Sequence, residues 1–219
     1  MKIPATILLL SVLASPGNGA SGLAPDWQPS TQADEWDIRY SPGMPEHPER
    51  DGKGWRFSFP QYDGALPCGV ICPSVGYVTT RAAAPLNGLS IAITVEITGP
   101  GIFEYRLDPD NTCWRPAAVR LFIQRRDDDD SQDSYRWWSN PAAINLRQGD
   151  HSLDVPLTPD QWSNVLGEKG DVVREEFYAA LENVESIGMT FGGGCFFGHG
   201  VNVSGGPATF VVKKLEILR

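Results

Sequence analysis

The sequence predicts an all-β protein, an antiparallel β-sandwich of the jelly-roll kind with a small helical insertion near residues 159–184. Apolar and polar residues alternate strictly in 89–98, LSIAITVEIT, as they do in a strand with one buried face. Most other apolar segments are also short, and turns rich in glycine and proline separate them. Because helix signals are confined to one stretch, these patterns favour two packed sheets.

The predicted strands are short and bounded by turn residues, and they lie at 54–59, 77–80, 89–98, 102–107, 117–125, 186–191 and 207–218. The Gly-Pro-Gly turn at 99–101 predicts a hairpin in which 102–107 pairs back onto the strand before it. In 117–125 the alternation places Leu121 toward the core and Phe122 on the outer face. The strands are therefore expected to have an inner and an outer side.

Helix signals begin only after residue 157. The run Thr158-Pro159-Asp160-Gln161 has the form of a capping box with proline at the first helical position, which predicts a short helix that ends by Gly167. Asp171 is placed to cap a second helix with an apolar face. These two helices form the predicted insertion.

The first 20 residues have the pattern of a secretory signal peptide, with Lys2 before an apolar stretch at 7–13 and small residues after it. Residues 21–53 are rich in Pro, Gly, Asp and Glu, which predicts an extended lead-in rather than a core element. Residues 54–219 are then expected to form a single β-sandwich domain. The mature protein is expected to be secreted or periplasmic.

The chain carries a formal net charge of −9 at pH 7. An acidic surface argues against nucleic acid as a partner, because the phosphate backbone attracts a basic footprint. Neutral ligands and divalent cations remain candidates. No segment is long and apolar enough to predict a membrane span, and the sequence leaves the oligomeric state open.

The four cysteines predict two disulfides in an exported chain, for which three pairings are possible. Cys68 and Cys72 are close enough in sequence to close a local loop, which leaves Cys113 to pair with Cys195. In the chain-entropy model, such a long crosslink lowers the entropy of the unfolded chain and so stabilises the folded protein by about 4–5 kcal/mol. A metal site at these cysteines is the weaker interpretation, because the histidines are scattered.

Calcium is the one cofactor that the sequence suggests, since Ca²⁺ prefers clustered carboxylate and carbonyl oxygens. Asp108 and Asp110 alternate in an oxygen-rich turn, although Asp and Asn also initiate turns that hold no metal. The acidic run at 127–130 lacks the spacing of a calcium loop and predicts a solvated, mobile segment.

The aromatic segment Tyr135-Arg136-Trp137-Trp138 is the strongest candidate ligand site. Strand alternation places Arg136 and Trp138 on one side, beside the outward Phe122, and places Tyr135 and Trp137 on the other. One tryptophan is expected to fill the core while the other presents its indole plane to a sugar ring. The residues expected to contact the sugar are Trp138 and Arg136 if their side of the strand faces outward, or Tyr135 and Trp137 if the other side does. The alternative is that both tryptophans only pack.

His199 stands between glycines at the end of the run at 192–200. These glycines allow positive φ and close backbone approach, so the run predicts a tight corner that joins the closing strands. His199 is a further candidate ligand residue, and in an enzyme it would need a carboxylate partner within hydrogen-bond reach. No G-x-S-x-G, H-E-x-x-H or P-loop motif is present, so no catalytic residue is assigned.

The order of signals from HSLDVPLTPDQW through SIGMTF to ATFVVKKLEIL resembles galactose-binding-like jelly rolls, the fold shared by many carbohydrate-binding modules. Such modules often end on a strand that bears an aspartate, whereas the closing strand here reads KKLEIL, and the GGGCFFGHG turn is not assigned to a characterised binding family. The resemblance implies sugar binding and establishes no residue. We therefore expect a secreted, non-catalytic sandwich that binds carbohydrate or a similar surface ligand through exposed aromatics. The alternatives are a hydrolase or lyase using His199, and a structural envelope protein with no small-molecule ligand.

Overall fold

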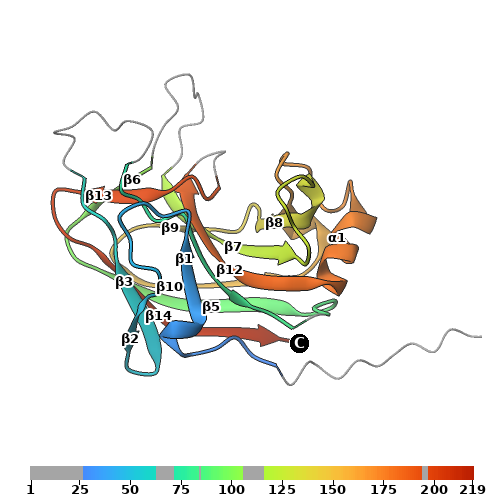
Figure 1. Ribbon diagram of the computed structural model, residues 1–219, viewed down its shortest axis with the longest axis horizontal. Helices are drawn as coiled ribbons and strands as arrows, with labels where there is room; N and C mark the ends of the chain where they lie inside the picture. Colours follow the sequence, from blue (N-terminus) through green and yellow to red (C-terminus); the bar gives the residue numbers. More distant parts are fainter. Residues whose placement is uncertain (1–26, 63–71, 84, 106–115, 194–196) are drawn as a thin grey trace, which may run out of the picture.

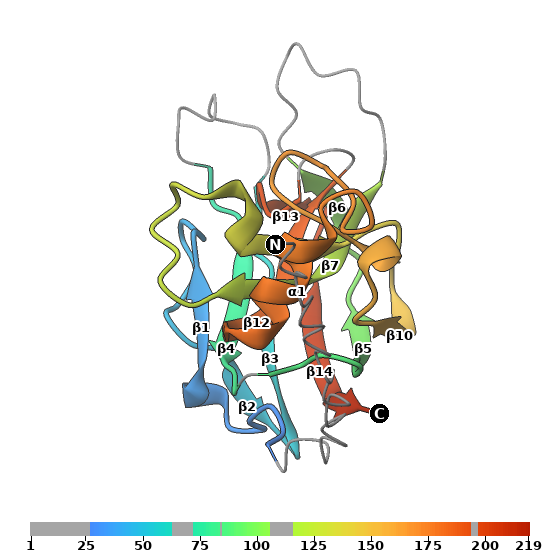
Figure 2. The same ribbon diagram turned by 90° about the vertical axis from the view of Figure 1, so that its right-hand side faces the viewer.

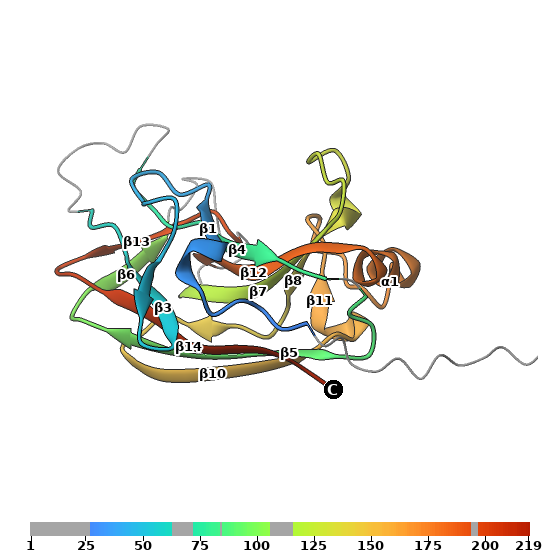
Figure 3. The same ribbon diagram turned by 60° about the horizontal axis from the view of Figure 1, so that its bottom comes forward.

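Two antiparallel β-sheets pack face to face in the computed structural model (Figures 1 and 3). Every pairing between named strands is antiparallel. The antiparallel β-sandwich predicted from the sequence is therefore confirmed. The structure describes residues 27–62, 72–83, 85–105, 116–193 and 197–219.

The first sheet has seven strands. In spatial order they are β1 (Trp36–Arg39), β4 (Tyr77–Arg81), β12 (Val184–Gly193), β7 (Ala117–Arg125), β8 (Arg136–Ser139) and β11 (Trp162–Ser163), with β9 (Ile144–Asn145) also pairing with β7. On β7, Leu121 and Ile123 belong to the core, whereas Phe122 and Gln124 lie on the outer face. This outer face of the seven-stranded sheet, turned away from the second sheet, carries the candidate site.

The second sheet has five strands, in the order β10 (Gly149–Pro156), β5 (Ser90–Thr98), β14 (Thr209–Leu218), β3 (Gly54–Ser58) and β2 (Glu49–Asp51). On β5 every second residue from Ile91 to Ile97 is buried, as the alternation predicts. A separate two-stranded sheet consists of β6 (Ile102–Tyr105) and β13 (Val201–Ser204). It lies at one end of the sandwich in Figure 1.

Aromatic side chains fill the space between the two large sheets. Trp36 from the first sheet and Trp55 from the second have ring centroids 4.7 Å apart. Phe191 of β12 contacts Phe57 and Phe210 of the opposite sheet at 5.5 and 5.2 Å between ring centroids. Tilted and edge-on aromatic pairs each contribute about 0.5–1.5 kcal/mol beyond the burial of their area. These contacts tie one sheet to the other.

A single α-helix, α1 (Arg174–Glu182), covers the other end of the sandwich within the described part of the chain (Figures 1 and 2). Its buried residues Phe177, Ala180 and Leu181 face the core, and the Phe177 ring lies 5.0 Å from that of Trp137. Short 3₁₀ helices occupy Ala33–Glu35, Asp133–Tyr135 and Pro159–Gln161. The helical content therefore falls mainly in the predicted insertion, near 159–184.

The extent of the first predicted helix in that insertion is wrong. Only a 3₁₀ turn forms, the side chain of Thr158 makes no capping hydrogen bond, and the chain then extends as β11. The reason is Trp162, which is fully buried and donates its indole N–H to the carbonyl of Pro156 at 2.8 Å. The second helix is flanked at its start by Val173 rather than capped by Asp171.

The predicted hairpin between 89–98 and 102–107 is also wrong. β6 pairs with β13, whereas both edges of β5 are occupied by β10 and β14. Gly99, at φ +96°, turns the chain out of the five-stranded sheet at this point, where a Cβ atom would meet the carbonyl of Pro207. The pairing is set by strands that come much later in the sequence.

Part of the predicted lead-in belongs to the core, so its description as an extended segment outside the core is wrong. β1 is an edge strand of the seven-stranded sheet, and Trp36 is fully buried. Its indole N–H donates to the carbonyl of Ser30 at 2.8 Å. The low apolar content of this region concealed two short strands, β1 and β2, the first of which carries a large buried side chain.

Several of the sequence predictions fall wholly or partly outside the described residues. They concern the signal peptide, the start of the lead-in, the end of the predicted strand at 102–107, the calcium site at Asp108 and Asp110, part of the glycine run at 192–200, and three of the four cysteines. Cys72 is disulfide-bonded, and its pairing with Cys68 and that of Cys113 with Cys195 stay predictions. In the part of the chain that the structure describes, no helix has both the length and the apolar character that a membrane crossing needs.

Candidate ligand-binding groove

The strand register gathers aromatic rings on the outer face of the seven-stranded sheet. Thr79 of β4, Gly188 of β12, Phe122 of β7 and Trp138 of β8 are successive partners across four strands. The rings of Phe122 and Trp138 have centroids 5.3 Å apart, and Tyr77 meets Phe122 edge-on at 5.2 Å. Period-two alternation therefore builds an aromatic strip on this face.

A cavity of about 380 Å³ lies over this strip. Its lining combines aromatic rings with hydrogen-bonding groups, chiefly those of Tyr40, Tyr77, Phe122, Gln124, Arg136 and His199. An apolar floor with a few convergent polar groups is typical of small-molecule sites. We call this space the first cavity.

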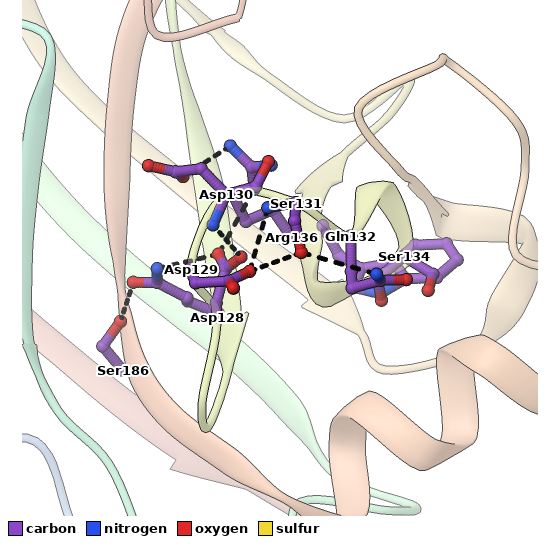
Figure 4. A network of polar contacts seen from close by, with 10 residues as sticks. Asp128, Asp129, Asp130, Ser131, Gln132, Ser134, Arg136 and Ser186 are labelled. Carbon is purple, nitrogen blue, oxygen red and sulfur yellow. Dashed lines mark hydrogen bonds and ion pairs between the residues drawn. The ribbon is translucent and has the colours of Figure 1, made fainter.

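Two aspartates of the acidic loop hold the guanidinium of Arg136 in place (Figure 4). Its Nε lies 3.2 Å from Oδ2 of Asp128, and Nη1 lies 2.8 Å from Oδ1 of Asp130. Gln124 donates through Nε2 to Asp128 at 2.9 Å, and Ser186 donates through Oγ to Gln124 at 3.1 Å. Because the side chain of Asp128 is fully buried, the expectation of a wholly solvated loop is wrong.

Two tyrosines form the side of the first cavity nearest β1. Tyr40 follows β1 directly, lines the cavity and is 63% exposed. Its ring lies edge-on to that of Tyr77, and the guanidinium carbon of Arg39 lies 5.6 Å from its centroid. Burial raises the pKa of Tyr77 to about 12, so its phenol stays protonated and can donate or accept a hydrogen bond.

The turn at 198–200 brings His199 to the same cavity. Gly198 and Gly200 have φ of +84° and +100°, and a Cβ atom on Gly198 would lie 2.7 Å from the ring of Tyr77. The predicted use of glycine for positive φ and close approach is confirmed at these two positions. His199 is exposed as a whole residue, yet partial burial of its imidazole ring lowers the pKa of that ring. The ring is therefore neutral at pH 7.

A second cavity of about 540 Å³ adjoins the first. The two cavities share Tyr77, Arg136 and His199, which stand between them. Beyond these three residues the second cavity is lined by Trp138, by Asn140, by Phe197 and by the turn at 164–167. The two spaces together form a groove along the outer face.

The structure brings together four of the six predicted ligand residues. Phe122, Arg136, Trp138 and His199 all line the groove, which agrees with the phase that places Trp138 beside Arg136. Trp138 is only 5% exposed, however, so it is a buried wall of the groove rather than an exposed platform.

The other two predicted ligand residues lie elsewhere. Trp137 is fully buried in the core, where its Nε1 donates to the carbonyl of Ser134 at 2.8 Å. Tyr135 ends a 3₁₀ turn, and the guanidinium of Arg125 lies 4.3 Å from its ring centroid. Among the described residues, no three or more His, Cys, Asp or Glu side chains gather as they would around a metal ion.

Sequence reasoning missed Tyr40, Tyr77 and Gln124. Alternation in 77–80 would have placed Tyr77 on the same face as Thr79, and that in 117–125 places Gln124 beside Phe122. Tyr40 gave no local signal, because it lies in a segment poor in strand patterns.

No protein-family model and no curated protein matches the chain. Among solved structures, the chain is similar to a xylan-binding module, CBM15. The superposition has a TM-score of 0.43 and 14% sequence identity, and it covers 86% of this chain and 96% of that module.

Proposed function

We propose that this protein is an exported, non-catalytic β-sandwich that binds carbohydrate in the groove on the outer face of its seven-stranded sheet. The observation that carries the proposal is the first cavity, in which the exposed Tyr40 ring stands beside Gln124 and Arg136. A sugar ring has apolar C–H faces and a rim of hydroxyls. Flat aromatic side chains suit the faces, and amide and guanidinium groups suit the hydroxyls.

The acidic residues in the groove favour a binding function over glycoside hydrolysis, because they are too few and already paired. Hydrolysis of a glycosidic bond ordinarily needs two carboxyl groups on either side of that bond. Among the described residues that line the two cavities, Asp130 is the only carboxylate, and it is ion-paired with Arg136. His199 lines the groove as a neutral imidazole, which suits a hydrogen bond to a hydroxyl.

Retention on insoluble polysaccharides tests the proposal. The protein is mixed with a panel that includes xylan, cellulose, mannan and chitin, and the bound fraction is measured. We expect retention on at least one of them and its loss in Tyr40→Ala, since the platform is removed. The matched control is Tyr178→Ala, an exposed tyrosine on α1.

Absence of retention on every polymer would count against carbohydrate binding, as would equal retention by Tyr40→Ala and the unaltered protein. Release of new reducing ends from a retained polymer would support the hydrolase alternative instead.

A further inference from the structure

We propose that the second cavity receives an acyl ester carried by the sugar that binds in the first, so that the ligand is an acylated glycan. This inference rests on the proposed carbohydrate function and adds the chemistry of a second subsite. It starts from the outer lip of the second cavity, which is formed by Val165 and Leu166. These side chains are 42% and 67% exposed.

Hydrogen bonds fix the turn that carries these two residues, so their exposure follows from a defined backbone conformation. Asn164 is 3% exposed, and its Oδ1 accepts hydrogen bonds from the backbone N–H groups of Leu166 and Glu168, each at 3.0 Å. Its Nδ2 donates to Oε2 of Glu168 at 2.8 Å, and its carbonyl accepts from the N–H of Gly167 at 3.0 Å. One buried amide therefore fixes the turn that presents two aliphatic side chains beside the cavity.

Aliphatic side chains select a different part of a ligand than aromatic rings do. A sugar face is matched by a flat ring such as that of Tyr40, whereas branched aliphatic groups have no flat face to offer. They gain instead by covering a methyl or an aryl group and so removing its apolar surface from water. The lip of the second cavity is thus suited to an apolar substituent.

The inner wall adds a donor that suits an ester carbonyl. Trp138 is 5% exposed and lines the second cavity, and its Nε1–H has no acceptor among the described residues. A buried donor without a partner destabilises the folded protein, so an acceptor supplied by a ligand would be favoured. An ester combines such an acceptor with an apolar end.

The two cavities are contiguous, so one sugar can engage both. Tyr77, Arg136 and His199 belong to the lining of each cavity. A ring that stacks in the first cavity can therefore direct a substituent past these residues into the second. The subsite would then distinguish acylated sugars from bare ones.

The test compares O-acetylated xylan and O-acetylated glucomannan, each before and after alkaline removal of the acetyl groups. Affinity electrophoresis measures the dissociation constant of the full chain for each polymer. We expect the acetylated form to bind about fourfold more tightly, the effect of burying roughly one methyl group. Leu166→Ala should remove this preference, so that the dissociation constants for the acetylated and the deacetylated polymer become equal. The matched control is Val172→Ala, an exposed aliphatic residue before α1.

Equal affinity for the two forms would overturn the acyl subsite and leave the carbohydrate function intact. The acyl subsite is likewise overturned if Leu166→Ala weakens binding of both forms alike. If neither form of either polymer binds while another polysaccharide is retained, the subsite is overturned and the proposed function stands. If no polysaccharide of any kind is retained, both proposals fail.

Discussion

The ring of Tyr40 lies edge-on to the ring of Tyr77, with centroids 5.3 Å apart, at the mouth of the first cavity. Tyr40 adopts φ +50°, in the left-handed region that costs a residue with a Cβ about 1–2 kcal/mol. Its backbone is pressed against Gly76, where a Cβ atom would lie 2.6 Å from the Tyr40 carbonyl oxygen. Such strain often accompanies function, and here it fixes an exposed ring beside the groove.

Tyr40→Gly should separate stability from binding. Glycine adopts positive φ without strain, so the free energy of unfolding should stay the same or rise by about 1 kcal/mol. Polysaccharide retention should be lost, because the ring is gone. Urea denaturation and the retention assay measure the two effects.

Tyr40→Phe is the matched control for that substitution, since it keeps both the ring and the strain. It should keep most of the retention and leave stability nearly unchanged. Loss of stability in Tyr40→Gly with retention preserved would show that Tyr40 has a structural role instead.

The two aspartates that hold Arg136 should differ in their contribution to stability. The side chain of Asp128 is fully buried, accepts from Gln124 and pairs with Arg136, so Asp128→Asn leaves a partly buried guanidinium without its buried counter-charge. We expect a loss of about 3 kcal/mol in the free energy of unfolding. Asp130 is 62% exposed, and Asp130→Asn should cost less than about 1 kcal/mol.

Asparagine tolerates the positive φ of Asp130, so backbone strain does not confuse the comparison. Chemical denaturation of both variants in the same buffer provides the measurement. Equal losses in the two variants would contradict a special role for the buried carboxylate.

The alternation of residues was enough to predict which side of a strand each residue faces. It placed Phe122, Arg136 and Trp138 on one outer face, and the groove contains all three. Alternation has a period of two along one strand and says nothing about the neighbouring strand. The pairing of β6 with β13 and the place of β1 at a sheet edge therefore could not be predicted.

Exposure was the other quantity that local pattern could not supply. Trp138 shares its cavity with the segments at 164–167 and 197–199, which are distant in the sequence. Whether an outward residue is open or covered depends on such segments. For the same reason the sequence favoured Trp138, which is covered, as the exposed aromatic ring. It did not indicate Tyr40, which is exposed but lies in a segment without a strand pattern.

Thr190 of β12 should be stabilised by losing its hydroxyl. It is 1% exposed, and its Oγ1 has no hydrogen-bond partner among the described residues. Thr190→Val keeps the shape and the β-branched side chain while removing a buried, unpaired polar group. We expect the free energy of unfolding to rise by about 1 kcal/mol.

The same substitution at Thr80 should act in the opposite direction. Thr80 donates through Oγ1 to the carbonyl of Glu35 at 2.7 Å, so Thr80→Val should lower the free energy of unfolding by about 1 kcal/mol. Thermal and urea denaturation of the two variants compare the signs. A loss of stability in Thr190→Val would mean that its hydroxyl is paired in solution.

The phenol of Tyr77 predicts a specific decline in stability at alkaline pH. Burial raises its pKa from 10.0 in the unfolded chain to about 12 in the folded protein. Between these values the unfolded chain has released the proton and the folded protein still holds it. Ionisation therefore favours unfolding, and stability falls as pH rises through this window. From pH 9 to pH 11 the contribution of Tyr77 should amount to about 1 kcal/mol.

Urea denaturation at pH 9 and pH 11 measures this loss, and Tyr77→Phe isolates the part that belongs to Tyr77. The phenylalanine variant should lose about 1 kcal/mol less than the unaltered protein between the two pH values, because it has no proton to release. Ultraviolet absorbance should likewise show one tyrosine that ionises only near pH 12, absent in the variant. An equal loss in both proteins would show that the Tyr77 phenol is open to water in the folded protein.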